Sequence, residues 1–381
     1  MQRDLRRALV ATFIARTIAN AALRVVYPFL PAIARGLGVT PASVASAIAL
    51  RNLGGFGTPL VARAAERHGR RSIMSGAMVA VAAGCFLTAA TGELLVAAAG
   101  MVAVGFAKPA FDISMQAWFG DRVPYAERGR IFGITELTWS VAIVLVPLAA
   151  LLIEATSWRA PFIVLGAAAS VGAVLIRRGL DPDRPVEHVR RPVRLDRSAV
   201  ALLLSVWLFS LASEMPFIVY GQWLESDFGL SIAGIGLFTL VIAVAELGGE
   251  GAVMAVSDRI GLKRMWLWGA IVSGGAYLAL GAVGGSLAAA VGVVMIWIVA
   301  FEVTIVAAIP FASELKAESR DRFLSLFAVM VSAGRVAGAL LAQPLFSAGD
   351  MGAVGAASAA AVFASAILLL FVPDHGQRED V

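Results

Sequence analysis

The sequence predicts an all-α membrane protein with twelve transmembrane helices in two six-helix halves. Its 381 residues are 59% hydrophobic and only 15% charged, and their mean hydropathy is +0.84, whereas soluble proteins are about a quarter charged. Apolar runs of the ~20 residues needed to cross a bilayer recur along the whole chain. Because so little polar surface is available, we expect lipid to cover most of the folded chain.

Twelve apolar segments are long enough to span a bilayer, and short loops separate most of them. The first follows a basic start, "MQRDLRRALVATFIART", that is typical of a signal peptide. No small-residue cleavage site ends this apolar run early, so we interpret it as an uncleaved first span. The expected spans cover residues 7–33, 41–62, 72–91, 93–117, 130–153, 159–177, 198–223, 230–256, 265–284, 286–311, 323–347 and 351–372.

One loop is longer than the others and divides the spans six and six. It reads "GLDPDRPVEHVRRPVRLDRS" at 178–197 and is rich in proline and arginine. We therefore expect an N-terminal half at 1–177, a cytoplasmic linker at 178–197 and a C-terminal half at 198–381. An even number of spans places both termini on the same side of the membrane.

Lysine and arginine are concentrated in the loops on one side of the expected membrane. Loops on the side of the termini hold 24 of the 31 Lys and Arg residues, and the opposite loops hold two, Arg35 and Arg159. Because basic loops stay in the cytoplasm, we expect an integral protein of a bacterial-type inner membrane with both termini cytoplasmic. The pI of 9.9 then reflects topology, and nucleic acid is not an expected partner.

Two short charged motifs recur at one fixed separation. Glu66 precedes Asp258 by 192 residues, and "ERGR" at 127–130 precedes "SRDR" at 319–322 by the same number. A constant offset at two separate landmarks indicates an internal repeat of six spans, so the two halves are expected to be pseudo-symmetric. Repeats of this kind are typical of transporters, whose sites lie near the bilayer midplane.

These motifs resemble a known family. "ERHGRR" at 66–71 and "DRIGLKR" at 258–264 are similar to the acidic–Arg–x–Gly–basic loop of each half in the major facilitator superfamily, and "PYAERGRIFG" at 124–133 also resembles it. The resemblance covers essentially the whole chain and implies a transporter with a central cavity that works by alternating access. It also implies a cytoplasmic gate formed by Glu66, Arg67, Arg70, Asp258, Arg259 and Lys263.

Ionisable residues occur inside some of the expected spans, although each costs roughly 3 kcal/mol at a helix centre. They fall in spans 1, 2, 4, 5, 7, 8, 10 and 11. In the superfamily the remaining four spans are peripheral, while 1, 4, 7 and 10 line the cavity, so this distribution separates lipid-facing from cavity-facing helices. The residues are Arg16, Arg24, Arg51, Lys108, Asp112, Glu136, Glu214, Glu246, Glu250, Glu302 and Arg335.

Four carboxylates are the candidates for binding a proton or a cationic substrate. Glu214 and Glu302 lie near the middle of spans 7 and 10, whereas Asp112 and Glu136 lie in the cytoplasmic halves of spans 4 and 5. A carboxylate at such a depth is costly unless it is protonated or paired. We expect these four residues to carry proton coupling or substrate binding; the alternative is that each is a permanently paired structural ion.

Five further polar residues are expected to balance charge in the cavity. Arg16, Asn20 and Arg24 step by four along span 1, which places them on one face of a helix. Lys108 lies one turn before an acid in span 4 and can pair with it. Arg335 lies halfway along span 11.

The sequence favours a proton-coupled antiporter, similar to the bacterial drug/proton antiporter branch, that exports small apolar or amphipathic compounds as a monomer. Asparagine occurs only at Asn20 and Asn52, which supplies few of the amide groups that a sugar site needs. The alternative is a transporter of an anionic metabolite or lipid bound by intramembrane arginines. The spans contain no nucleophile–base pair, metal-ligand cluster or phosphate-binding loop, so we expect no enzyme, metal or cofactor.

Overall fold

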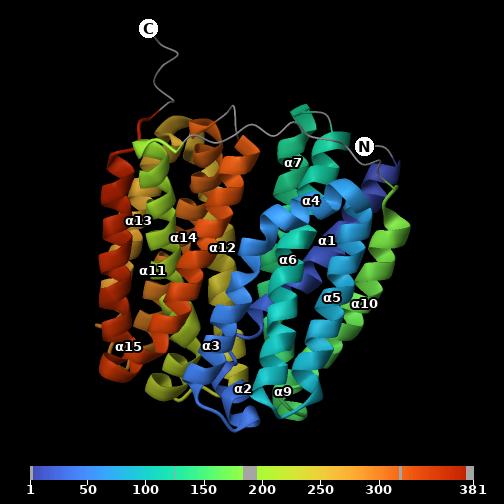
Figure 1. Ribbon diagram of the computed structural model, residues 1–381. Coiled ribbons are helices and arrows are strands. Elements are labelled where there is room, and N and C mark those ends of the chain that lie inside the picture. Colours follow the sequence, from blue (N-terminus) through green and yellow to red (C-terminus); the bar gives the residue numbers. More distant parts are fainter. Residues whose placement is uncertain (1–2, 124, 183–194, 317–319, 375–381) are drawn as a thin grey trace. The chain divides into compact units, whose positions relative to one another are not determined.

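The computed structural model describes residues 3–123, 125–182, 195–316 and 320–374, and every regular element within them is a helix (Figure 1). The all-α prediction is confirmed for this part of the chain. The chain divides into two compact units, Met1–His188 with Ser231–Leu240, and Val189–Leu230 with Val241–Val381.

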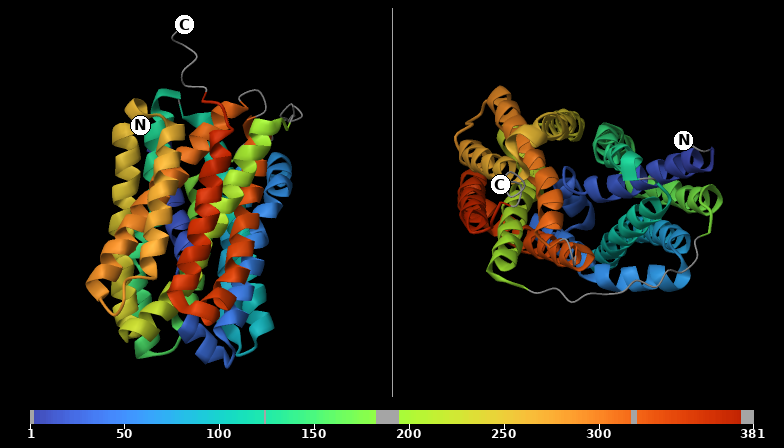
Figure 2. Two further views of the ribbon diagram at one scale, coloured as in Figure 1. Left: turned by 90° about the vertical axis from the view of Figure 1, so that its left-hand side faces the viewer. Right: turned by 90° about the horizontal axis from the view of Figure 1, so that it is seen from above.

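The first unit is built from consecutive helices joined by short turns. They are α1 Arg3–Arg24, α2 Leu30–Leu37, α3 Pro41–Asn52, the 3-10 helix η1 Leu53–Gly57, α4 Thr58–His68, α5 Arg70–Ala90, α6 Leu94–Arg122, α7 Tyr125–Glu136, α8 Thr138–Val144, α9 Val146–Ala155 and α10 Ala160–Gly179. Within this unit α1 packs against α6, α8 and α10, and α5 packs against α6 and α10 (Figures 1 and 2). Contacts on several sides of α1 bury the polar face that it carries.

Three of the expected spans are interrupted, and proline or glycine, which weaken a helix, lie at most of the breaks. α1 ends at Arg24, and Pro28 and Pro31 lie before and at the start of α2. The second expected span passes through η1, in which three of five residues are glycine. The fifth is divided into α7, α8 and α9, and Pro147 stands in the first turn of α9.

The second unit contains longer helices. They are α11 Arg197–Phe228, α12 Ile232–Ile260, whose first turns belong to the first unit, α13 Leu262–Leu280, α14 Leu287–Leu315 and α15 Arg320–Leu370. The backbone of α15 is not helical at Gly349 and Asp350, so this element consists of two helices joined at a sharp bend. The bend falls between the two expected spans 323–347 and 351–372. α11 packs along α15, and α13 packs against both α14 and α15.

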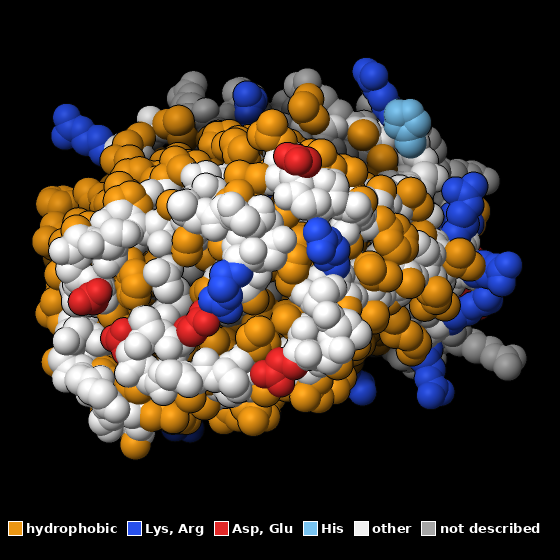
Figure 3. All heavy atoms as spheres, turned by 90° about the horizontal axis from the view of Figure 1, so that it is seen from below, with side chains coloured by type: hydrophobic (Ala, Val, Ile, Leu, Met, Phe, Trp, Pro, Cys, Tyr) orange, Lys and Arg blue, Asp and Glu red, His pale blue; other side chains and the backbone are white. Residues whose placement is uncertain are grey.

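Eight helices of the described residues are long and apolar enough to cross a membrane, or up to nine if a pair bent by 111° is one span. Large apolar side chains are also exposed on both units, including Leu148 at 56% and Val244 at 60%. Seen from below, charged side chains are few and lie scattered among apolar and uncharged ones (Figure 3). Exposed apolar side chains such as Leu148 and Val244 are stable in lipid and not in water.

The duplicated loop has one backbone conformation in both copies. Gly69, before α5, has φ 83° and ψ 143°, and Gly261, before α13, has φ 85° and ψ 143°. A positive φ strains any residue with a side chain and favours glycine. The sequence similarity of these two loops therefore extends to their local geometry.

Candidate functional site

Four charged side chains from three helices of the first unit contact one another. We call them the charge cluster: Arg16 on α1, Lys108 and Asp112 on α6, and Glu136 at the end of α7. Arg16 Nε donates to Asp112 Oδ1 at 3.0 Å, and Arg16 Nη2 lies 3.0 Å from Glu136 Oε1. Lys108 Nζ, one turn before Asp112, contacts the other oxygen of the same carboxylate. Asp112 therefore links two cations on different helices.

The cations of the charge cluster lie deeper than its carboxylates. Arg16 and Lys108 are each 3% exposed, whereas the side chains of Asp112 and Glu136 are 21% and 45% exposed. A buried charge is stable only when it is paired and hydrogen-bonded. The two carboxylates therefore hold the buried cations and keep part of their own surface exposed.

The interruption between α7 and α8 supplies a further acceptor. α7 ends at Glu136 and α8 begins at Thr138, which leaves the Thr135 carbonyl available at the end of a helix. It accepts from Arg16 Nη1 at 2.5 Å and from the Thr138 hydroxyl at 2.6 Å. The break in the fifth expected span thus helps to position Arg16.

The same side of α7 and α8 also receives the other polar residues of α1. Asn20 Nδ2 donates to Thr138 Oγ1 at 3.0 Å. The centre of the Trp139 ring lies 4.9 Å from Arg24 Cζ and 4.6 Å from Lys108 Nζ, which is within the range of a cation–π interaction. Arg16, Asn20 and Arg24 therefore share one neighbouring segment.

Thr135, Thr138 and Trp139 are functional candidates that the sequence reasoning missed. The signal that could have found them is the stretch "ITELTWS" at 134–140, in which hydroxyls and an indole flank Glu136.

In the second unit, a different ion pair joins α11 to α15. Arg335 Nε donates to Glu214 Oε2 at 2.8 Å; the glutamate is 2% exposed and the arginine 39%. Two turns further along both helices, Gln343 donates to Gln222 at 3.0 Å. The predicted residues Glu214 and Arg335 are thus brought together.

Two glycines permit the close approach of these helices. A Cβ added to Gly334 would lie 2.3 Å from the Trp207 carbonyl oxygen, and one added to Gly338 would lie 2.7 Å from the Leu211 carbonyl oxygen. Small residues four apart are a common way to bring two membrane helices into contact. They fix the distance across which the ion pair forms.

Glu302 lies on α14 directly after Phe301, which belongs to a group of aromatic rings. It is 7% exposed, and its neighbour Phe301 stacks on Phe209 with ring centroids 5.6 Å apart. Phe217 packs on Trp297 at 4.8 Å. Phe217 and Phe301 are only partly buried, so these rings offer an apolar surface.

The predicted gate residues lie at helix ends. Arg70 donates to Asp121 and to the Ala117 carbonyl within the first unit, and Lys263 donates to the Val372 carbonyl at 2.5 Å within the second. Arg67 and Arg259 are exposed, and the side chains of Glu66 and Asp258 lie outside the part of the chain that the structure describes. Each described contact ties helix ends together inside one unit.

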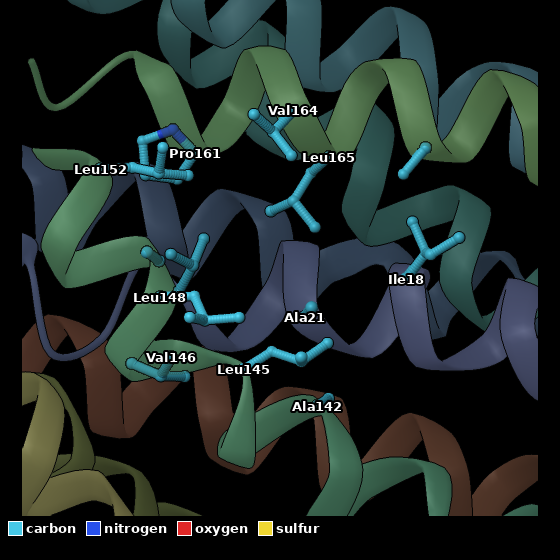
Figure 4. Close-up of a pocket in the computed structure, with 13 residues that line it drawn as sticks. Ile18, Ala21, Ala142, Leu145, Val146, Leu148, Leu152, Pro161, Val164 and Leu165 are labelled. Carbon is cyan, nitrogen blue, oxygen red and sulfur yellow. The ribbon is translucent and has the colours of Figure 1, made fainter. Parts of the chain in front are cut away.

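An apolar pocket of about 220 Å³ lies elsewhere in the first unit, between α1, α8, α9 and α10 (Figure 4). Ile18 and Ala21 line it from α1, Leu148 from α9 and Leu165 from α10. Every lining residue is apolar, so the pocket is separate from the charge cluster. Among the described residues, no group of three His, Cys, Asp or Glu side chains is placed to hold a metal ion.

Apolar helices of membrane-spanning length, with paired charges buried between them, define an integral membrane protein of the secondary-transporter class. Residues 12–202 match the family model of the Major Facilitator Superfamily, and the chain belongs to this superfamily. It is therefore a membrane transporter and not an enzyme.

Two relatives from Bacillus subtilis (strain 168) carry the names of MFS-type transporters. YceJ, described as uncharacterized, is 27% identical over 133 residues, which are 32% of this chain and 34% of that protein. The chain thus spans about a third of that relative's length. YwfA, also described as uncharacterized, is 23% identical over 363 residues, which are 91% of this chain and 87% of that protein.

Solved structures show the same fold. A bacterial homolog of the human lysosomal transporter Spinster, in an inward-facing, unoccupied conformation, matches with a TM-score of 0.74 and 14% identity. The inward-facing, occupied conformation matches with a TM-score of 0.73 and 15% identity. Both comparisons cover 98% of this chain and 95% of the other.

Proposed function

We propose that the chain is a proton-coupled antiporter that exports small apolar or amphipathic compounds by alternating access. The observation that carries this proposal is the position of Asp112 between Arg16 of α1 and Lys108 of α6. A proton on Asp112 competes with both cations for the carboxylate oxygens. Protonation then favours a different arrangement of the two helices, which is the differential interaction that coupling requires.

Three further carboxylates are proposed to take part in proton coupling or substrate binding. Glu136 is the most exposed acid of the charge cluster and is suited to exchange protons with water. Glu214 and Glu302 stay proposed coupling or substrate residues of the second unit, where a proton on Glu214 would release Arg335. Buried acids of this kind in transporters mark proton or ion pathways.

The aromatic group beside Glu302 supports an apolar or amphipathic substrate. Phe217 and Phe301, which contact each other, present partly buried rings, and Phe301 is the residue before Glu302. Ring faces attract organic cations as well as apolar groups. A lipophilic cation would combine both contacts, with its charge near Glu302.

We further propose twelve spans in two pseudo-symmetric halves, 1–177 and 198–381, which work as a monomer in a bacterial inner membrane. The bend in α15 supports its division into two spans. Helices α1 and α13 are proposed as further spans; their basic residues lower their mean hydropathy, so they are not among the eight helices identified by length and hydropathy. The basic helix ends support cytoplasmic termini. Residues 183–194 of the proposed linker 178–197 lie outside the described residues.

The duplicated loop is proposed to act as a cytoplasmic gate. Charges at helix ends pair when two halves close and become hydrated when the halves separate. The bonds of Arg70 and Lys263 to neighbouring helix ends keep each copy of the loop in a fixed place from which such pairing can occur.

A second candidate function is transport of an anionic metabolite or lipid. One observation favours it: Arg24 and Lys108 both lie over Trp139, so cationic side chains from α1 and α6 gather at one indole ring. A concentration of positive charge suits an anionic ligand.

Proton movement in inverted membrane vesicles tests the proposal. A pH-sensitive dye would follow protons while lipophilic cations, neutral drugs and organic anions are added to wild type, Asp112→Asn and Glu302→Gln. We expect cations or neutral drugs to trigger proton release from the wild-type vesicles, and at least the Asp112 variant to lose it. The matched control is Glu93→Gln, because Glu93 is an exposed acid outside the charge cluster.

Two outcomes contradict the antiporter. One is tracer flux of an anion with no proton response to any compound, which would favour the second candidate. The other is proton release that Asp112→Asn and Glu93→Gln leave equally intact, which would remove Asp112 from coupling.

A further inference from the structure

Helices α1 and α10 of the first unit pack closely along part of their length. A Cβ added to Gly179 would lie 2.7 Å from Ala11 Cβ, and one added to Gly172 would lie 3.7 Å from Ala15 Cβ. Residue numbers rise along one helix while they fall along the other, so the two helices are antiparallel. These four small residues mark the side of each helix that faces its neighbour.

Next to this contact, each helix carries aliphatic side chains with one arginine near the helix end: the start of α1 and the end of α10. We call this surface the α1–α10 face: Arg7, Val10 and Ile14 on α1, and Val171 and Arg178 on α10. Successive helical residues are about 100° apart. The residues of this face on α1, and those on α10, therefore lie about a quarter turn away from the small residues at the helix contact. Because the helices are antiparallel, the two sets open toward the same side of the helix pair.

The α1–α10 face is exposed. Val10 is 53% exposed, Ile14 40% and Val171 58%, and Arg7 and Arg178 are exposed as well. Among the described residues, neither guanidinium forms an ion pair or a hydrogen bond. Two cations thus stand at one end of an aliphatic surface.

The aliphatic surface leads into the apolar pocket. Ile18 and Ala21 line the pocket from α1 (Figure 4). At about 100° per residue, they lie on the side of the helix that bears Val10 and Ile14. Ile18 lies eleven residues beyond the arginine, or about 16 Å along the helix. That distance is about half of the ~30 Å hydrocarbon core, so a lipid anchored at the arginines reaches the pocket with its acyl chain.

We propose that the α1–α10 face binds one anionic phospholipid. Its phosphate contacts Arg7 and Arg178, and one acyl chain lies along Val10, Ile14 and Val171 toward the pocket. Basic residues between membrane helices recognise anionic headgroups, and the aliphatic side chains below them match a lipid chain. The bound lipid fixes α1 against α10 and does not depend on what the transporter carries.

The test uses the full chain in phosphatidylcholine vesicles with spin-labelled phosphatidylglycerol as the probe. The relative association of this lipid, compared with spin-labelled phosphatidylcholine, is measured for wild type and for Arg7→Gln/Arg178→Gln. We expect the preference for phosphatidylglycerol to fall about fivefold for each arginine removed.

Arg6→Gln/Arg177→Gln is the matched control. These arginines are exposed and each precedes a proposed ligand by one residue, so they lie about 100° away around the same helices. The control removes the same charge at the same depth and is expected to lower the preference by clearly less than Arg7→Gln/Arg178→Gln does.

Three outcomes would overturn the proposal. An equal loss in both double variants would show attraction by surface charge alone, and no loss in either would show that Arg7 and Arg178 bind no lipid. Displacement of the labelled lipid by glycerol phosphate would show that the headgroup binds without a chain.

Discussion

Arg16 of α1 and Asp112 of α6 are joined by a 3.0 Å hydrogen bond between guanidinium Nε and carboxylate Oδ1, with the arginine buried below the partly exposed acid. The second oxygen of the carboxylate contacts Lys108. Asp112 therefore contacts both buried cations, and Glu136 is a second acid only for Arg16. Loss of the charge on Asp112 weakens both contacts at once, and this sensitivity makes it suitable for coupling.

Asp112→Asn is expected to destabilise the folded protein by about 3 kcal/mol, since removal of one partner leaves buried charge uncompensated. The substitution keeps the size of the side chain and removes its charge. Chemical or thermal unfolding of the purified protein in detergent measures the change.

Adding Lys108→Met to Asp112→Asn should recover part of this loss, because the pair is then removed together and one buried cation no longer lacks its acid. A double-mutant cycle gives the coupling free energy between the two positions. Strictly additive effects of the two substitutions would contradict the contact inferred for this pair.

The Glu214–Arg335 pair is expected to respond asymmetrically. Arg335→Gln leaves a carboxylate that is 2% exposed, whereas Glu214→Gln leaves a guanidinium that is 39% exposed and can be hydrated. The arginine variant should therefore lose more stability than the glutamate variant, by about 1–2 kcal/mol. Unfolding of both variants under one condition measures the difference; equal losses, or a larger loss in Glu214→Gln, would contradict it.

Gly334→Ala is expected to destabilise the second unit by about 1–3 kcal/mol, because overpacking forces backbone shifts. The added Cβ would lie 2.3 Å from a backbone carbonyl oxygen of α11, which cannot turn away as a side chain can. Thermal unfolding measures the loss.

Gly275→Ala is the control for this substitution. Gly275 is also helical, and no atom lies within 4 Å of its added Cβ. Alanine should be neutral or stabilising there, because it favours the helix over glycine. Similar destabilisation by both substitutions would indicate that helix propensity, and not close packing with α11, determines the result.

The fold class and most helix positions could be predicted from hydropathy, because lipid requires long apolar helices. The interruptions were harder to predict. Pro28, Pro31 and Pro147 are local signals for a helix break. Mean hydropathy does not reveal such a break, because it stays high across the whole apolar segment. The break at Leu137 has no proline or glycine at its position, so its role in exposing the Thr135 carbonyl required the structure.

The candidate site was predictable in its residue types and not in its pairings. An acid four residues after a lysine, as in Lys108 and Asp112, can be paired from helical spacing alone. The contact of Arg16 with Asp112 spans 96 positions in the sequence, and no local pattern encodes such a contact. The same holds for Glu214 and Arg335, which come from two different helices.

Asp196 precedes α11 and is expected to make stability depend on pH. Its carboxylate accepts from Lys316 Nζ at 2.6 Å and from the Ala199 backbone N–H at 2.9 Å. The Lys316 contact first, and then the backbone bond, hold the pKa of Asp196 below its usual value. Because the folded pKa is lower than the unfolded one, this stabilisation is fully present above the usual aspartate pKa of about 4. It is lost as the pH falls through the folded value.

Asp196→Asn isolates this effect, since asparagine also caps a helix N-terminus but does not titrate. The unfolding temperature of wild type should exceed that of the variant at pH 7, and the difference should shrink as the pH falls below about 4. Because the Asp196 side chain is 57% exposed, the difference should be small and should decrease further in high salt. Unfolding curves that stay parallel for the two proteins across this range would show that the charge of Asp196 contributes nothing, and that its cap alone holds the start of α11.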